Sequence, residues 1–135
     1  GRDESKLKEQ ATRHHYPYEV AEVAEHNKLV NQLKRAQVLI HCGGPFQHTA
    51  VAMVKACAEA QTHYTDITGE YQVFEALASM DSLAKNANIL VMPGVGFDVV
   101  PSDCLALHLK NLLPDATHLQ LAFTMGKGGL SRGTS

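Results

Sequence analysis

The chain has 135 residues, of which 44% are hydrophobic and 19% charged, and its formal net charge is −2. This length suits one domain with a sizeable core, and the balanced charge excludes the basic surface that nucleic acids and anionic membranes select. The longest apolar runs fall far short of the roughly 20 residues of a membrane helix, so no intrinsic membrane span is predicted.

The first half of the chain is predicted to alternate between helices and strands. Asp3 is a good N-cap for a helix over about residues 4–14. The alternating pattern of residues 18–23 indicates a short strand, and the apolar spacing within residues 26–35 indicates a second helix. The compact apolar run 38–40 predicts a buried strand that enters a glycine-containing loop.

The second half continues this alternation. Helices are predicted over residues 49–60, 73–86 and 101–113, strands over 63–67, 89–92 and 119–123, and a flexible tail over 126–135. The last helix carries Leu105, Leu109 and Leu112 on one face. Continuous apolar strands are typical of a sheet buried on both faces by crossover helices. The predicted class is therefore α/β with a mainly parallel sheet, in one domain over residues 1–125.

Three predicted strands are followed directly by turns that contain glycines or acids. These turns are Cys42-Gly43-Gly44-Pro45-Phe46, Asp66-Ile67-Thr68-Gly69-Glu70 and Pro93-Gly94-Val95-Gly96-Phe97-Asp98. Because the carboxyl ends of parallel strands meet at one edge of a sheet, we expect all three turns to line one cleft. Glycines there would let the backbone approach a bulky ligand such as a dinucleotide.

Each of these residues also has a simpler interpretation. The two glycines after residue 42 equally suit a flexible strand exit. Asp66 and Glu70 are expected either to cap the helix that follows Gly69 or to hold a polar group of the substrate, and the same choice applies to Asp98. Tyr64 is either a core residue or a proton donor.

Cysteines and histidines suggest no special chemistry. Cys42, Cys57 and Cys104 are widely spaced, which argues against a disulfide framework and favours a reducing, cytoplasmic compartment. Cys42 is expected to be a small buried residue, since no base is evident beside it. The eight histidines are scattered, so no metal site is predicted.

Four segments taken together resemble the saccharopine dehydrogenase-like oxidoreductases, a family that includes the trans-acting enoyl reductases of mycobacteria. They are the run from Val38 to Phe46, Val54-Lys55-Ala56-Cys57, the run from His63 to Glu70, and Gly96-Phe97-Asp98-Val99-Val100-Pro101-Ser102-Asp103. The similarity extends over essentially the whole chain. It implies a Rossmann-type NAD(P)-binding domain and hydride transfer to or from a small-molecule substrate.

The resemblance also implies roles for single residues. Arg2 is expected beside the adenosine 2′-phosphate, which favours NADP, while Asp3 leaves NAD open. The residues from Cys42 to Phe46 are expected next to the nicotinamide half of the cofactor. The substrate side is expected to be lined by Tyr64, Asp66, Glu70, Gly96, Phe97 and Asp98, of which Asp98 and Tyr64 are the catalytic candidates.

The family pattern also includes a strand, a glycine-rich turn and a helix that would precede Gly1, and a substrate domain that would follow Ser135. We therefore expect a Rossmann-type sheet that lacks its first β-α-β unit. Such a fragment should be inactive, bind dinucleotide weakly or not at all, and leave a gap in its sheet or fill it as a homodimer. The competing functions are a true saccharopine reductase and a non-catalytic scaffold or membrane-associated assembly protein that retains a Rossmann shell.

Overall fold

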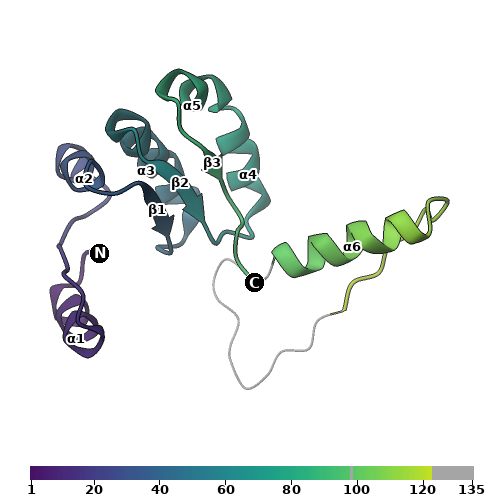
Figure 1. The fold of residues 1–135 in the computed structure, drawn as a ribbon, viewed down its shortest axis with the longest axis horizontal. Helices are drawn as coiled ribbons and strands as arrows, with labels where there is room; N and C mark the ends of the chain where they lie inside the picture. The colour runs from purple at the N-terminus through teal and green to yellow at the C-terminus, as the bar shows by residue number, and fades with distance from the viewer. Residues whose placement is uncertain (98, 123–135) are drawn as a thin grey trace.

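The computed structural model of the chain describes residues 1–97 and 99–122, in which helices and short strands alternate (Figure 1). The helices are α1 (Glu4–His14), α2 (His26–Leu33), α3 (Phe46–Ala60), α4 (Tyr71–Ala78), α5 (Asp81–Ala87) and α6 (Val100–Leu112). The strands are β1 (Val38–His41), β2 (His63–Asp66) and β3 (Val91–Met92). This order confirms the predicted α/β class.

The three strands form one parallel sheet in the order β1-β2-β3. His41 aligns with Asp66 across the first pair of strands, and Tyr64 aligns with Val91 across the second. Helix α3 connects β1 to β2, while α4 and α5 connect β2 to β3. A parallel sheet with helical crossovers is the Rossmann-type arrangement that the sequence predicts.

Burial alternates along the strands, so that one face of the sheet is covered and the other is open. In β1 the side chain of His41 is buried, whereas Val38 and Ile40 are 49% and 66% exposed. Both crossovers advance in the same direction along the sheet, and right-handed crossovers then place their helices on the same face. The prediction that these strands are buried on both faces is therefore wrong for the part of the chain that the structure describes.

The hydrophobic core lies on the covered face, where α2, α3 and α4 pack together. Their buried apolar side chains recur at helical spacing, and they are Leu29, Val30, Leu33, Phe46, Ala50, Met53, Val54, Ala56, Cys57, Ala58, Val73 and Leu77. A polar contact closes one end of this core. The buried hydroxyl of Thr62 donates to the carbonyl of Leu33 at 2.8 Å, which links the start of β2 to the end of α2.

Helix α1 begins and ends as its sequence predicts. The side chain of Asp3 accepts a hydrogen bond from the backbone N–H of Lys6 at 3.2 Å and satisfies one free donor of the first turn. Arg13 and His14 occupy the last turn, where a positively charged side chain interacts favourably with the helix dipole. His15 then adopts the left-handed conformation that ends the helix.

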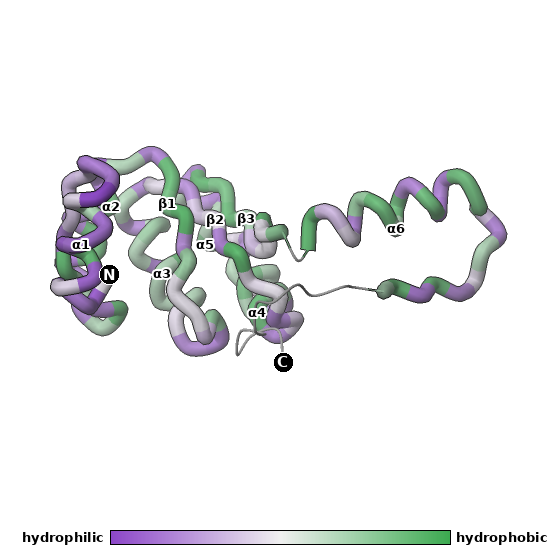
Figure 2. The backbone as a smooth tube through the Cα atoms, turned by 90° about the horizontal axis from the view of Figure 1, so that it is seen from below, coloured by the Kyte–Doolittle hydropathy of each residue, from purple (hydrophilic) through white to green (hydrophobic). Residues whose placement is uncertain are grey.

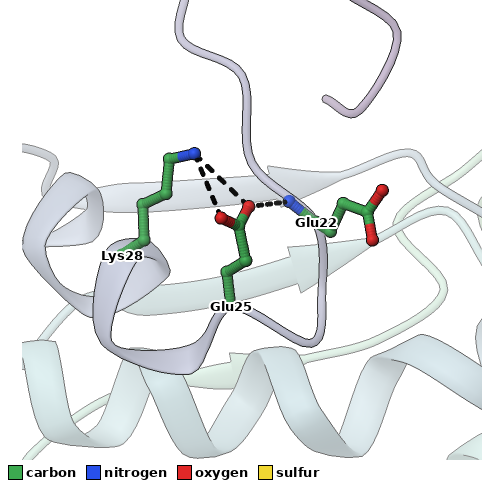
Figure 3. A network of polar contacts seen from close by, with 3 residues as sticks. All are labelled: Glu22, Glu25 and Lys28. Atoms are coloured by element: carbon green, nitrogen blue, oxygen red, sulfur yellow. Dashed lines mark hydrogen bonds and ion pairs between the residues drawn. The ribbon is translucent and has the colours of Figure 1, made fainter.

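A small polar network fixes the start of α2 (Figure 3). The carboxylate of Glu25 accepts the backbone N–H of Glu22 at 2.8 Å, and the ammonium of Lys28 lies 3.3 Å from each oxygen of that carboxylate. These contacts lower the pKa of Glu25, chiefly through the hydrogen bond from Glu22. The network holds residues 22–25 in a turn.

This turn explains why the predicted strand over residues 18–23 is absent. A strand needs a neighbouring strand to accept and donate its backbone hydrogen bonds. Here the N–H of Ala21 donates to the carbonyl of Gly1 at 2.9 Å, and β1 pairs only with β2 among the described strands. The segment follows an irregular path instead.

Several other boundaries differ from prediction. Helix α3 begins at Phe46, the predicted helix 73–86 is divided into α4 and α5 at Ser79 and Met80, and β3 is two residues long. The predicted strand 119–123 is wrong over residues 119–122, which have no strand partner, and residue 123 lies outside the described part. The predicted tail 126–135 also lies outside it.

Helix α6 extends away from the sheet and its helices (Figures 1 and 2). Pro101 lies in its first turn, as predicted. None of its residues is buried, and the predicted apolar face is open, with Leu105 and Leu112 54% and 64% exposed. Within the described residues, no helix has the length and apolar character needed to cross a membrane.

Candidate functional site

The carboxyl ends of β1, β2 and β3 lie along one edge of the sheet, because all three strands are parallel. The turns at these ends are residues 42–47, 66–70 and 93–97, counted with the first two residues of α3 and the last residue of β2, and we call these three turns together the rim. Hydrogen bonds connect the turn after β2 with each of the other two. The prediction that the parallel strands deliver these turns to one edge is therefore confirmed for the described residues.

Glu70 connects the first two turns of the rim. One of its carboxylate oxygens accepts the backbone N–H of Phe46 at 3.0 Å, and the other accepts that of Gln47 at 2.9 Å. Its own N–H donates to the hydroxyl of Thr68 at 3.0 Å. Glu70 occupies the N-cap position of α4, the helix after Gly69, but its side chain makes no hydrogen bond to that helix. Its carboxylate caps α3 instead, so the predicted cap of α4 is wrong for the side chain.

Asp66 connects the second and third turns from a fully buried position. Its carboxylate accepts the backbone N–H groups of Thr68 and Gly94 at 3.0 and 2.8 Å and the hydroxyl of Tyr64 at 2.8 Å. Its backbone carbonyl accepts the N–H of Val95 at 2.8 Å. Its oxygens contact none of the N–H groups of α4, so the predicted helix cap is wrong for Asp66 as well.

Tyr64 is completely buried beneath the rim. Burial, and next the hydrogen bond to Asp66, raise the pKa of its phenol far above the ordinary value. A phenol in this environment stays protonated and stabilises the carboxylate that it faces. Of the two interpretations of Tyr64, the core position is the one observed.

The turn after β1 presents an exposed backbone. Cys42, Gly43, Gly44 and Pro45 are all exposed, so the expectation of a buried Cys42 is wrong. The hydroxyl of Thr49 lies 3.1 Å from the carbonyl of Gly43 and 3.3 Å from that of Pro45. These contacts tie the turn to the first turn of α3 while leaving its glycine backbone open to a ligand.

His41 is the member of this arrangement that sequence reasoning missed. Its imidazole Nε2 lies 2.8 Å from the hydroxyl oxygen of Thr49, and its ring meets Phe46 edge-on at a centroid distance of 5.3 Å. Burial lowers the pKa of His41, although the charge of Asp66 opposes this shift. The sequence feature that could have identified His41 is its position as the last residue of a predicted strand, directly before a glycine-containing turn.

The remaining predicted site residues are dispersed. Gly96 is buried, whereas Phe97, the last residue of the third turn, is 90% exposed. Arg2 is exposed at the N-terminus, which lies on the side of the sheet toward which β1 and β2 point (Figure 1). Asp98 lies outside the described residues.

Two features of this part of the chain have the chemistry to hold part of a nicotinamide dinucleotide, namely the turn after β1 and Arg2. The open backbone of Gly43 and Gly44 leaves room for a ribose or a ring to approach closely. The guanidinium of Arg2 has no ion-pair partner among the described residues and suits a phosphate group. The carboxylates of Asp66 and Glu70, by contrast, are occupied by protein N–H groups.

Comparison with known proteins agrees with the Rossmann-type fold. Residues 1–92 match the family described as the saccharopine dehydrogenase NADP binding domain. The chain is 32% identical over 95 residues to a trans-acting enoyl reductase of Mycobacterium ulcerans, with 70% of this chain and 23% of the relative covered.

Two further relatives show the same relationship. Identity is 32% over 106 residues to a trans-acting enoyl reductase of Mycobacterium leprae, covering 76% of this chain and 25% of the relative. It is 29% over 93 residues to a saccharopine dehydrogenase-like oxidoreductase of Mus musculus, covering 68% and 22%. The chain thus spans about a quarter of the length of these relatives, and it belongs to the saccharopine dehydrogenase family through its NADP-binding domain.

Proposed function

We propose that the protein acts as an NADP-dependent oxidoreductase on a small-molecule substrate. The observation that carries the proposal is the rim, where three turns from parallel strands are tied together beside an open glycine backbone. NADPH, when bound, supplies a hydride to an electrophilic carbon, so that the cofactor is oxidised and the substrate gains two electrons. Relatives named as oxidoreductases and enoyl reductases support this class of reaction.

The cofactor contacts in this proposal belong to Arg2 and to the five residues from Cys42 to Phe46. Arg2 would bind the 2′-phosphate and thereby favour NADP over NAD, because a guanidinium forms paired hydrogen bonds with phosphate oxygens. The turn after β1 would lie against the nicotinamide half, where its backbone can approach a ring without obstruction from Cβ atoms. NAD remains the alternative if Asp3 excludes the 2′-phosphate.

The substrate side in this proposal is formed by the second and third turns, in which Gly96 is buried and Phe97 is exposed to solvent. Asp66 and Glu70 would shape that side through the backbone they hold rather than by contact with substrate. Asp98 and Tyr64 are the catalytic candidates, and the burial of Tyr64 makes Asp98 the better one. The test is the turnover rate of Asp98→Asn and Tyr64→Phe variants of the full-length protein. An unchanged rate in a variant would exclude a catalytic role for the residue that it replaces.

A screen for NADPH oxidation by the full-length protein against carbonyl, imine and enoyl substrates tests the proposed class. Turnover with saccharopine or its precursors would identify a true saccharopine reductase. Absence of both turnover and NADPH binding would favour the non-catalytic scaffold, for which the open leucines of α6 offer an interaction surface.

Residues 1–135 by themselves are proposed to bind NADPH weakly or not at all and to be inactive. The described sheet has three strands, with β1 at one edge, and a dinucleotide normally contacts a wider Rossmann sheet. Calorimetry on the 135-residue chain that gives micromolar NADPH affinity would contradict this proposal.

The free edge of β1 also supports a homodimer as one way to complete the sheet, because β1 pairs only with β2 among the described strands and its other edge has backbone groups that a second copy could pair with. Light scattering coupled to size exclusion would measure the mass of the 135-residue chain. A cytoplasmic location is proposed as well, on the basis of three free cysteines.

A further inference from the structure

The rim is joined by one continuous series of hydrogen bonds that crosses all three turns. It begins at the N–H of Gly94, passes through the carboxylate of Asp66 to the N–H of Thr68, and continues from the hydroxyl of Thr68 to Glu70. The carboxylate of Glu70 then reaches the N-terminus of α3. Segments separated by more than 20 residues are thereby fixed in one arrangement.

We infer that Glu70 is a positioning residue. By binding the N-terminus of α3, it holds the preceding turn after β1 in the position in which that turn contacts the cofactor. The inference rests on the proposed function for the identity of the ligand. Glu70 does not need to contact the ligand itself, since its two oxygens are each taken by a backbone N–H of Phe46 or Gln47.

The physical basis is the pairing of a charged acceptor with a helix end. Charge-assisted hydrogen bonds are stronger than neutral ones, and a carboxylate at a helix N-terminus also interacts favourably with the helix dipole. Helix α3 has 15 residues, and its N-cap, Pro45, has no side-chain hydrogen bond to offer. Glu70 therefore supplies from another turn the cap that the sequence at the start of α3 lacks.

This arrangement also determines what the turn after β1 can bind. The first N–H groups of a helix often hold phosphate, but those of Phe46 and Gln47 are already engaged by Glu70. A phosphate there would meet a carboxylate. The open feature is the uncharged backbone of Gly43 and Gly44, which suits the ribose or the ring of the nicotinamide half.

The decisive experiment compares Glu70→Ala with Glu75→Ala in the full-length protein. Glu75 is an exposed residue of α4 whose carboxylate has no hydrogen-bond or ion-pair partner within the described part, so both changes remove one negative charge from the same helix region. NADPH fluorescence titration should give a dissociation constant raised on the order of tenfold for Glu70→Ala, since the loss of preorganisation weakens binding. Glu75→Ala should stay within about twofold of wild type.

The conservative variant Glu70→Gln provides the readout that a general loss of stability would not reproduce. One amide oxygen can still accept an N–H, whereas the NH₂ group cannot. Its affinity should therefore lie between those of wild type and Glu70→Ala, and once the cofactor is saturating its turnover should approach that of wild type. An unchanged dissociation constant in Glu70→Ala would overturn the inference.

Amide hydrogen exchange separates this inference from the proposed function. The N–H groups of Phe46 and Gln47 should lose protection in Glu70→Ala, while Val54 in the middle of α3 keeps it. If wild-type protein binds no NADPH but this local loss occurs, the positioning role survives and the cofactor assignment fails. Unchanged protection of Phe46 and Gln47 would refute the positioning role itself, whatever the cofactor.

Discussion

The buried carboxylate of Asp66 accepts the backbone N–H of Gly94 at 2.8 Å, although 28 residues separate them in the sequence. This bond fastens the end of β2 to the turn after β3. Because Asp66 also accepts bonds from Thr68 and Tyr64, its removal would leave several buried donors without partners.

Replacing Asp66 by Asn should therefore destabilise the chain strongly. The amide oxygen can still accept the N–H groups of Thr68 and Gly94, but these buried bonds lose the carboxylate charge that strengthens them, and the NH₂ group replaces the acceptor of the Tyr64 hydroxyl, so the free energy of unfolding should fall by about 1–3 kcal/mol. Urea unfolding followed by circular dichroism measures the change. Asp115→Asn is the matched control, since Asp115 is exposed and should alter stability by less than about 0.5 kcal/mol. Equal effects of the two substitutions would contradict the role given to Asp66.

Gly94 should not tolerate a side chain. Its φ is +71°, and a Cβ atom there would lie 2.6 Å from Cζ of Phe74. Gly94→Ala combines the strain of a left-handed conformation with this overlap, and should lower the free energy of unfolding by about 1–3 kcal/mol. Gly69→Ala serves as control, because Gly69 is exposed and does not have a positive φ. A melting temperature unchanged by Gly94→Ala would show that Phe74 and the turn adapt freely.

His41 should make stability depend on pH. Burial lowers its pKa in the folded chain, so the unfolded chain binds more protons below the unfolded value of about 6.5. Neutral His41 therefore makes its full contribution to the free energy of unfolding above about pH 6.5. This contribution is lost progressively as the pH falls toward the pKa of His41 in the folded chain. Urea unfolding between pH 5 and pH 8 should show a smaller loss at low pH for His41→Gln than for wild type.

The control for that measurement is His108→Gln, since His108 is an exposed residue of α6. It should retain the pH dependence of the wild type. A His41 ring that titrates at or above the ordinary histidine pKa in an NMR experiment would refute the predicted direction.

The three cysteines should differ in reactivity. Cys57 is fully buried, and burial raises the pKa of its thiol to about 12, whereas Cys42 and Cys104 are exposed. Since the thiolate is the reactive form, iodoacetamide at pH 8 should modify the two exposed thiols and leave Cys57 intact. Mass spectrometry of the peptides would reveal the pattern, and all three should react in denaturant. Rapid native alkylation of Cys57 would mean that the core of α3 opens readily.

Local sequence signals determined the elements that depend on neighbours in the chain. Asp3 defines the start of α1, and the apolar spacing of Leu29, Val30 and Leu33 predicts α2, because caps and helix faces involve residues within a few positions of one another. The strand β1 and the turns after the strands were likewise predicted from the local sequence. The parallel order of the strands then followed from their helical crossovers.

Tertiary structure alone decided what those turns do. One of the two roles predicted for Asp66 and Glu70 was a cap on the helix after Gly69, and instead their carboxylates bind N–H groups that lie 23 to 28 residues away. The strand predicted over residues 18–23 failed for the same reason, since a strand exists only where another strand pairs with it. Local patterns specify which backbone groups need partners, but only the folded chain determines which distant groups satisfy them.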